Sequence, residues 1–279
     1  MLNSKLKNMF QITIKKKVLW GIFFLCMTVL SACSDRTIVP MDYEEGRLYL
    51  PAAIYGNYNI DALTQAPLTP DPTPGYASRY SLNKDENQFE IPLAVYRGGI
   101  SNSNPVTVSI SVYSDTIAQM IAAGNLPDTV QLLPADKYTM PASVSLAGGE
   151  TVAPFALDID FDFLVQTSPT LYALPVRIDC ADQPCNPNLN VAIIVIDSRM
   201  VKPAPVFTYE AVRGDTKSFT FHNKSQYTLD FTWDFGDGQT AKDNDPTHTY
   251  AQAGDYTVTL TTAGLCDGTI SASQTVTAQ

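Results

Sequence analysis

Phe231-Thr232-Trp233-Asp234-Phe235-Gly236-Asp237-Gly238 predicts a β-strand that runs into a tight turn. Its aromatic side chains occur at every second position and therefore share one strand face. Glycine tolerates positive φ and aspartate can hydrogen-bond its neighbouring backbone, so the Gly-Asp-Gly end is typical of a tight turn. A strand with one apolar face predicts an antiparallel sheet that is buried on one side and wet on the other.

The same alternation recurs along most of the chain. Gly254 precedes another alternating strand, which contains Tyr256, Val258 and Leu260. Three further segments alternate apolar with polar residues in the same way: Val106–Val112, Phe155–Asp162 and Leu174–Asp179. Short half-buried strands separated by turn residues favour β-sandwiches, so we expect an all-β protein.

One helix is expected within this pattern. Ser114 or Asp115 can cap its start. The apolar residues Ile117, Met120 and Ile121 then recur at i, i+3 and i+4, which is the spacing of one helix face. We expect that face to cover one edge of the sheet.

Two proline clusters interrupt the alternation. The first lies in residues 61–80, here called the proline-rich excursion, and comprises Pro67, Pro70, Pro72 and Pro74. Proline removes the donors that a sheet needs, which predicts a surface loop. The second cluster, Pro203 and Pro205, follows the apolar strand Val191–Ile196 and predicts a domain boundary near residues 201–203.

The N-terminus has the pattern of an export signal. Five lysines and no acid precede the short apolar run Val18–Leu30, and small residues then lead to Cys33. Leu30-Ser31-Ala32-Cys33 resembles the bacterial lipobox. That resemblance implies cleavage after residue 32, lipidation of Cys33 by acyl chains such as palmitate, and a short tether at residues 33–42. The alternatives are an uncleaved membrane anchor, although the run is shorter than a spanning helix needs, and plain secretion with a free Cys33.

The charge of the mature chain excludes two kinds of partner. Removing residues 1–32 takes away five of the 18 basic residues and none of the 28 acidic ones, which leaves a formal charge of −15. Nucleic acid binding needs clustered lysine and arginine. Adhesion to anionic lipid needs positive charge as well, so the predicted membrane contact is the lipid anchor alone.

Three cysteines remain after Cys33. Cys180 and Cys185 flank four residues in a predicted hairpin loop. An exported protein can form disulfides, so these two cysteines are a candidate pair. Cys266 is then the odd cysteine, a buried or idle thiol.

The residues that usually carry chemistry do not form a recognisable site. His222 and His248 have no cysteine beside them, whereas zinc needs three or four ligands within reach. Neither a Gly-x-Ser-x-Gly elbow nor a phosphate-binding glycine loop occurs. We expect no cofactor and no catalytic residues. Paired carboxylates could hydrolyse a glycosidic bond, but two small sandwiches leave little room for a deep cleft.

Two groups of aspartates are weak calcium candidates: Asp158, Asp160 and Asp162 in the first, and Asp237, Asp243 and Asp245 in the second. The first group lacks the glycine and glutamate of the EF-hand pattern, and its alternation with apolar residues predicts the wet face of a strand instead. Turn chemistry explains each member of the second group.

The candidate ligand-binding residues are tyrosines in or beside the proline-rich excursion, namely Tyr55, Tyr58, Tyr76 and Tyr80. Tyrosine offers an apolar face with a polar tip, which suits sugar rings and protein surfaces. The alternative is that these rings pack the excursion onto the sandwich.

The C-terminal part resembles a known family. The segments Phe221–Ser225, Trp233–Gly238, Pro246–Tyr250 and Gly254–Leu260 occur in the order found in polycystic-kidney-disease (PKD) domains. The resemblance covers residues 203–279. It implies an immunoglobulin-like β-sandwich with Trp233 in the core, of a kind that is not catalytic and serves bacterial surface proteins and degradative enzymes as a spacer or accessory module.

The first module, residues 43–200, resembles the N-terminal immunoglobulin-like domain of unknown function of Bacteroidetes surface lipoproteins. The residues that carry this resemblance are Leu48–Ala53, Phe89–Val95, Val106–Val112, Leu133–Met140, Val144–Glu150 and Tyr172–Ile178. Relatives are often joined to glycan-binding or glycoside-hydrolase modules of polysaccharide-utilisation systems.

Together these features predict two tandem immunoglobulin-like sandwiches behind a lipoprotein signal peptide, held at the outer membrane or cell surface. The leading hypothesis is a non-catalytic accessory protein that captures glycans. A structural spacer, adhesin or assembly subunit that binds envelope proteins is the alternative. A hydrolase with an unfamiliar site is the third hypothesis.

Overall fold

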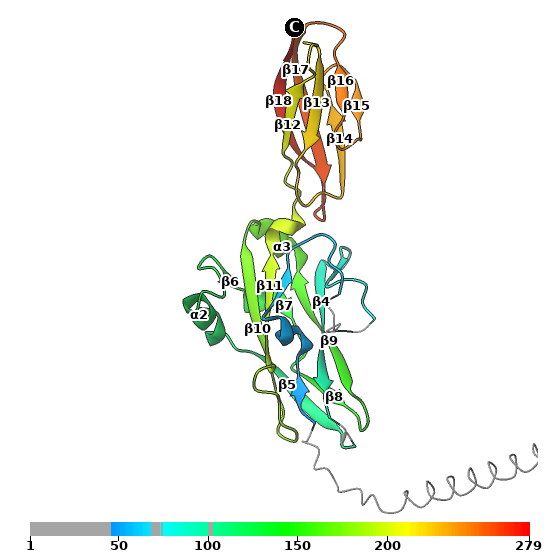
Figure 1. Cartoon of the computed structure of the whole chain (residues 1–279). Helices are drawn as coiled ribbons and strands as arrows, with labels where there is room; N and C mark the ends of the chain where they lie inside the picture. Colours follow the sequence, from blue (N-terminus) through cyan, green and yellow to red (C-terminus); the bar gives the residue numbers. More distant parts are fainter. Residues whose placement is uncertain (1–45, 68–72, 74, 100–102) are drawn as a thin grey trace, which may run out of the picture. The chain divides into compact units, whose positions relative to one another are not determined.

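The computed structural model of the protein describes residues 46–67, 73, 75–99 and 103–279 (Figure 1). The predicted signal peptide, Cys33 and the tether at residues 33–42 lie outside the described residues. Among the described residues, no helix has both the length and the apolar character needed to span a membrane.

The first module is built on two sheets. One sheet has the strand order β1-β4-β9-β7, and β3 pairs with the N-terminal end of β4. All of its pairs are antiparallel. Its strands are β1 (Leu48–Tyr49), β3 (Ser81–Asn83), β4 (Gln88–Arg97), β7 (Tyr138–Thr139) and β9 (Val152–Asp160).

The second sheet has the order β2-β11-β10-β5-β8, with β6 added to β10. Two of its pairs, β2 with β11 and β6 with β10, are parallel, and the others are antiparallel. Its strands are β2 (Asn57–Ile60), β5 (Val106–Val112), β6 (Gln131–Leu132), β8 (Ser143–Leu146), β10 (Leu171–Asp179) and β11 (Val191–Asp197).

The core of the first module lies between these sheets. Alternate residues of β9, such as Leu157 and Ile159, meet alternate residues of β10, such as Leu174 and Val176, and all four are at most 1% exposed. Burying one such side chain contributes about 2 kcal/mol. The predicted sandwich is therefore confirmed.

The predicted helix is α2 (Asp115–Ala122), but it does not lie at an edge of the sheet. Ile117 packs with Ala173, Ile193 and Val195, which point outward from β10 and β11, two interior strands of their sheet. Both faces of β10 and β11 are thus buried. Double burial explains why β11 is almost continuously apolar in sequence.

A second helix, α3 (Phe161–Thr167), begins within the segment Phe155–Asp162, whose last two residues the alternation wrongly predicts as strand. Strand β9 ends at Asp160, whose Oδ1 accepts a hydrogen bond of 3.0 Å from the Phe163 N–H and so caps α3. Asp158 and Asp160 do lie on a strand, whereas Asp162 lies in the first turn of α3. Three short 3₁₀ helices also occur: η1 (Pro51–Tyr55), η2 (Ala135–Lys137) and η3 (Ser198–Val201).

The second module is also a pair of sheets, with strand orders β12-β13-β16 and β15-β14-β17-β18, all antiparallel. The strands of the first are β12 (Phe207–Ala211), β13 (Ser218–Asn223) and β16 (Thr247–Thr249). Those of the second are β14 (Asp230–Asp234), β15 (Thr240–Ala241), β17 (Gly254–Ala263) and β18 (Ile270–Ala278).

Trp233 is the centre of the second core. It is fully buried, its ring packs edge-on against Phe207 at 5.1 Å and tilted against Phe221 at 5.7 Å, and its Nε1 donates to the Asp243 carbonyl at 3.0 Å. The turn that follows β14 has the predicted glycine geometry. Gly236 has φ +79°, and a Cβ there would lie 2.6 Å from the Thr257 carbonyl oxygen. Only glycine fits that approach.

Candidate functional site

The tyrosines of the proline-rich excursion do not form one exposed binding surface. Tyr58 and Tyr80 are buried, with 1% and 8% of their surfaces exposed. Tyr80 stacks on Phe89 with ring centroids 4.6 Å apart, and its hydroxyl donates to the Leu63 carbonyl. Burial raises the pKa of Tyr80 to about 12. Tyr80 thus fastens the excursion to the sandwich, and Arg79 of the excursion lies 5.9 Å from the centre of the Tyr58 ring.

The other two tyrosines differ from each other. Tyr55 is half-buried in η1 and packs against the core of the first module. Tyr76 is 40% exposed. The aromatic contact surface predicted from the sequence is thus reduced to Tyr76, because the sandwich uses the other rings for its own packing.

A polar cavity of about 180 Å³ lies at the β7 edge of the first sheet and is here called the β7 cleft. It is lined by Asn87, Gln88, Asp136, Lys137, Tyr138, Thr139, Asp158, Ile159 and Asp160. These residues come from the β3–β4 turn, from η2 with β7, and from the end of β9. Strand pairing positions them, because β9 lies between β4 and β7.

Asp160 is fully engaged within the cleft. Its carboxylate accepts hydrogen bonds from the Phe163 N–H at 3.0 Å and the Asn87 side chain at 2.9 Å, and Lys137 Nζ lies 3.6 Å away. Burial alone would raise its pKa, but these hydrogen bonds and the Lys137 charge outweigh burial and lower it. Lys137 is itself placed 5.7 Å from the centre of the Phe163 ring. Asp160 therefore serves as the N-cap of α3.

Asp158 is different, because its carboxylate, unlike its strand-paired backbone, has no hydrogen bond or ion pair with any described residue. It is half-buried, and burial raises the pKa of its carboxyl group. Glu90 on β4 and Thr139 on β7 lie directly opposite it across the sheet. Like charges facing each other across strands are unfavourable, and no protein cation offsets this pair among the described residues. Asp158 is thus an acceptor without an internal partner.

The cleft has the chemistry of a hydroxyl-binding site. The Asp158 carboxylate can accept hydrogen bonds, and the Gln88 amide and the Thr139 hydroxyl can each donate and accept them. Two carboxylates with pKa values moved in opposite directions also occur in acid–base catalysis. Here, however, the aspartate with the lowered pKa is occupied by its helix-capping bonds. The arrangement therefore favours binding over hydrolysis.

Sequence reasoning missed this cleft. The pattern draws attention to the aspartates of β9, but Asn87 lies in a turn and Lys137 in a 3₁₀ helix. The β4–β9 and β7–β9 pairings together bring them to the end of β9. The alternation that predicted a wet strand face was the one available signal.

The charged residues of the second module form pairs. His248, 7% exposed, places Nε2 2.8 Å from Asp237 Oδ2, and its ring stacks on Phe235 at 4.1 Å. His222 Nδ1 lies 3.3 Å from Asp245 Oδ1 on the surface. The three weak calcium candidates are therefore not gathered around one point. In the parts of the chain that the structure describes, no group of three or more histidine, cysteine or acidic residues could hold a metal ion.

Comparison with known families decides what the second module is. The family model described as the PKD domain matches residues 201–279. The chain carries a PKD domain. A second family model, described as an N-terminal domain, matches residues 69–184, so both resemblances found in the sequence are confirmed. No curated protein sequence matches the chain.

Three solved structures are similar to parts of the chain. The PKD1 domain of a Vibrio cholerae metalloprotease is 32% identical, covers 28% of this chain and 96% of its own, and has a TM-score of 0.25. A Bacteroides ovatus protein with the provisional name of a carbohydrate binding protein is 14% identical over 81% of this chain and 59% of its own, with a TM-score of 0.40. An auxiliary nutrient binding protein of Bacteroides thetaiotaomicron is 18% identical over 77% and 63%, with a TM-score of 0.33. The chain spans less than two thirds of these two Bacteroides structures.

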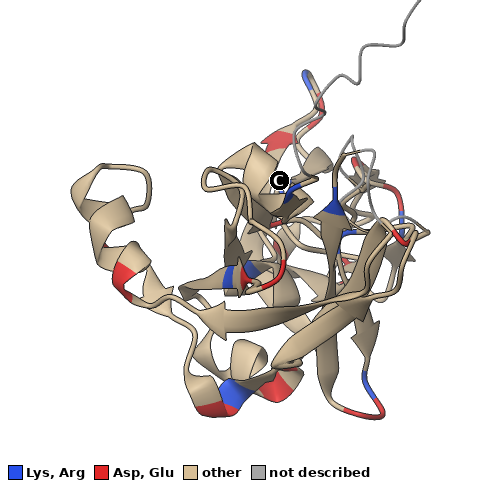
Figure 2. Cartoon of the chain, turned by 90° about the horizontal axis from the view of Figure 1, so that it is seen from below, with Lys and Arg blue, Asp and Glu red and all other residues tan. Residues whose placement is uncertain are grey.

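The cysteines lie in both domains. Cys180 and Cys185 are in the loop between β10 and β11, and Cys266 is a buried residue of the loop between β17 and β18. All three are free thiols in the structure, so the pairing of Cys180 with Cys185 stays a prediction. In the view from below, the lysine and arginine residues that can be seen lie apart from one another on different elements (Figure 2).

Proposed function

We propose that this protein is a non-catalytic, lipid-anchored accessory protein of the outer membrane or cell surface that captures glycans in the β7 cleft. The observation that carries the proposal is Asp158, a half-buried acceptor in a polar cavity without a partner among the described residues. Its oxygens are not among the buried atoms that lack a partner, so water reaches them in the free protein and hydrogen-bond donors of a ligand can replace that water. The hydroxyl groups of a sugar are donors of that kind.

The size of the cleft limits what it holds. The cleft offers about 180 Å³ of accessible space and is open to solvent on one side. That space suits a single sugar ring at a chain end or branch and is smaller than the cavities that enclose drug-sized ligands. Capture is therefore expected to be weak for one site and to gain strength when several anchored copies contact one polysaccharide.

Calorimetry of the folded mature chain with a panel of polysaccharides tests the proposal. Asp158→Ala removes the acceptor, and we expect affinity for the bound glycan to fall by about 10- to 100-fold, the usual effect of losing a hydrogen bond to a charged group. Asp128→Ala, an exposed aspartate outside the cleft, is the matched control and should bind like the wild type. Failure of every polysaccharide to bind, or equal binding by the Asp158→Ala protein, would refute glycan capture at this cleft.

The alternative function is a spacer, adhesin or assembly subunit that binds envelope proteins. The PKD domain favours it, because the first module can carry a binding site while the second adds length. A stoichiometric envelope protein captured by the wild type and by Asp158→Ala alike would support this alternative. Degradation of a polysaccharide that is lost in Asp158→Ala would instead support a hydrolase.

A further inference from the structure

The loop between β10 and β11 holds the strand through which the chain enters the first module. Leu48 donates to the Pro184 carbonyl at 3.1 Å and accepts from the Asn186 N–H at 2.8 Å, so both its N–H and its carbonyl bond to the loop. Leu50 donates to the Leu189 carbonyl at 2.8 Å. These bonds make the loop a neighbour of β1 opposite to β4.

Side chains reinforce this contact. Gln183, 8% exposed, reaches the chain just before β1 by donating from its Nε2 to the Gly46 carbonyl. Its Oε1 accepts a hydrogen bond of 2.7 Å from Nε of Arg97, a buried residue of β4. The loop, the entering chain and β4 are therefore linked through one buried glutamine.

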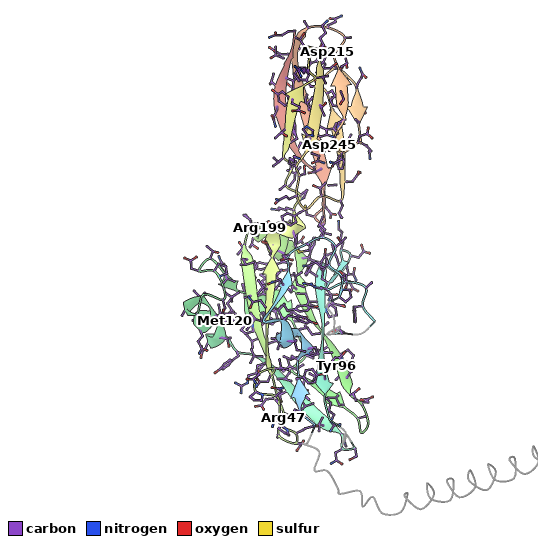
Figure 3. The ribbon with its side chains drawn as sticks, viewed as in Figure 1. Arg47, Tyr96, Met120, Arg199, Asp215 and Asp245 are labelled. Carbon is purple, nitrogen blue, oxygen red and sulfur yellow. The ribbon has the colours of Figure 1, made fainter. Side chains whose placement is uncertain are left out.

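β1 needs this support because it is short. It contains two residues and is paired with β4 by two residue pairs, Leu48 with Arg97 and Tyr49 with Tyr96. Arg47, which directly precedes it, lies at the end of the module where the chain enters (Figure 3). Any pull on residues before 46 acts first on β1, and the loop supplies several of the hydrogen bonds that resist it.

Two cysteines enclose Gln183 and Pro184, two of the four loop residues that make these contacts. Cys180 follows β10 directly, and Cys185 forms an isolated bridge with Leu48 of β1. Both side chains are half-buried against the core of the first module. Burial, the Asp179 charge and the neighbouring Cys180 raise the pKa of Cys185 to about 11. The two thiols are thus neighbours, and Cys185 is protonated near neutral pH.

We propose that Cys180 and Cys185 form an oxidisable pair whose disulfide fixes the loop and thereby locks β1 in place. The oxidant is a disulfide-bearing thiol oxidoreductase. One cysteine thiolate attacks the oxidant's disulfide and forms a mixed disulfide, and the second cysteine then displaces the oxidant as a dithiol. Two electrons and two protons pass from the cysteines to the oxidant. The bond closes a loop of few residues, so its effect is local.

Mass analysis of the full-length chain, purified without reductant and alkylated after denaturation, tests the chemistry. The tryptic peptide from Ile178 to Arg199 contains both cysteines and no other cleavage site for trypsin. We expect it to be unalkylated and lighter than its reduced form by two hydrogen masses. Cys266 should be alkylated in the same sample. If Cys180 and Cys185 stay alkylated after treatment with oxidised glutathione and oxidoreductase, the pair does not form and the proposal is overturned.

Amide hydrogen exchange tests the lock. The Leu48 and Leu50 amides, which donate to the loop, should exchange about 10- to 30-fold more slowly in the oxidised than in the reduced wild type, given the entropy of a short closed loop. The double variant Cys180→Ser, Cys185→Ser should match the reduced wild type, and Cys266→Ser should leave the oxidised rate unchanged. Equal exchange in oxidised and reduced protein would refute the lock even if the disulfide forms.

Discussion

Asp237→Ala is the most informative perturbation of the PKD domain. The Asp237 carboxylate connects the Gly-Asp-Gly turn to β16, because Oδ2 lies 2.8 Å from His248 Nε2 and Oδ1 accepts from the Gln239 N–H at 3.0 Å. His248 cannot turn to water instead, since its ring is stacked on Phe235 and meets Tyr250 edge-on. The substitution therefore leaves a buried ring nitrogen without a partner.

The expected loss follows from these contacts. An unsatisfied buried polar group costs about 1–3 kcal/mol, and the turn hydrogen bond to Gln239 adds about 1 kcal/mol at most because that amide can reach water. We expect the free energy of unfolding of the PKD domain to fall by about 2–3 kcal/mol. With a denaturant dependence of ~1 kcal/mol per molar urea for a domain of this size, the midpoint should move by about 2 M or more.

Fluorescence gives the assay its specificity. The chain has two tryptophans, and the one at position 20 is absent from protein that begins at Cys33, so the emission of Trp233 reports the PKD domain alone. The matched control is Asp245→Ala, which removes the exposed partner of His222 and should cost less than about 1 kcal/mol. A loss for Asp237→Ala no larger than that of the control would show that the buried pair does not stabilise the turn.

Three further predictions concern other parts of the chain. Burial would raise the pKa of Asp237, but hydrogen bonds from Gln239 and His248 outweigh burial and lower it. The stability that Asp237 contributes should therefore be present above the ordinary aspartate pKa, about pH 4, and be lost as pH falls through the folded value. Urea titrations of wild type and Asp237→Ala should converge in acid, and a gap that did not narrow below about pH 4 would contradict this. Gly236→Ala should destabilise the PKD domain by about 2 kcal/mol or more, since positive φ and a 2.6 Å approach to the Thr257 carbonyl act together. Gly238 has φ +89° but open space where a Cβ would lie, so Gly238→Ala should cost about 1 kcal/mol. Equal losses of stability in thermal unfolding would exclude the steric contribution at Gly236. Cys33→Ala should move the protein from the membrane fraction to the soluble fraction after cell lysis with both domains folded, and continued sedimentation with membranes would favour an uncleaved N-terminal anchor.

Apolar–polar alternation predicts the strands well because each of them packs one face against a hydrophobic core. Alternation predicts a strand over Phe155–Asp162, and the part up to Asp160 does belong to β9 with its apolar residues facing the core. The same rule fails at the next residue, Phe161, where α3 begins. An aspartate on a wet strand face and an aspartate that caps a helix look alike in sequence, and only the hydrogen bond from the Phe163 N–H distinguishes them.

The candidate site was harder to predict, because it depends on contacts between distant segments. Tyr58 and Tyr80 look like surface aromatics beside prolines, yet the sandwich buries both. The β7 cleft depends on η2 and the β3–β4 turn meeting the end of β9, and neither segment carries a motif. Residue types could be read from the sequence, but their neighbours could not.

Helix α2 gives the first module two sides with different accessibility. The outward residues of β10 and β11 are sealed by that helix, while the opposite sheet keeps polar side chains such as Glu90 and Asp158 on its outer surface. A fluorophore or affinity tag inserted after α2, near Gly124, would therefore sit on the far side of the sandwich from the cleft. That turn is therefore the place to attach a reporter without blocking the cleft.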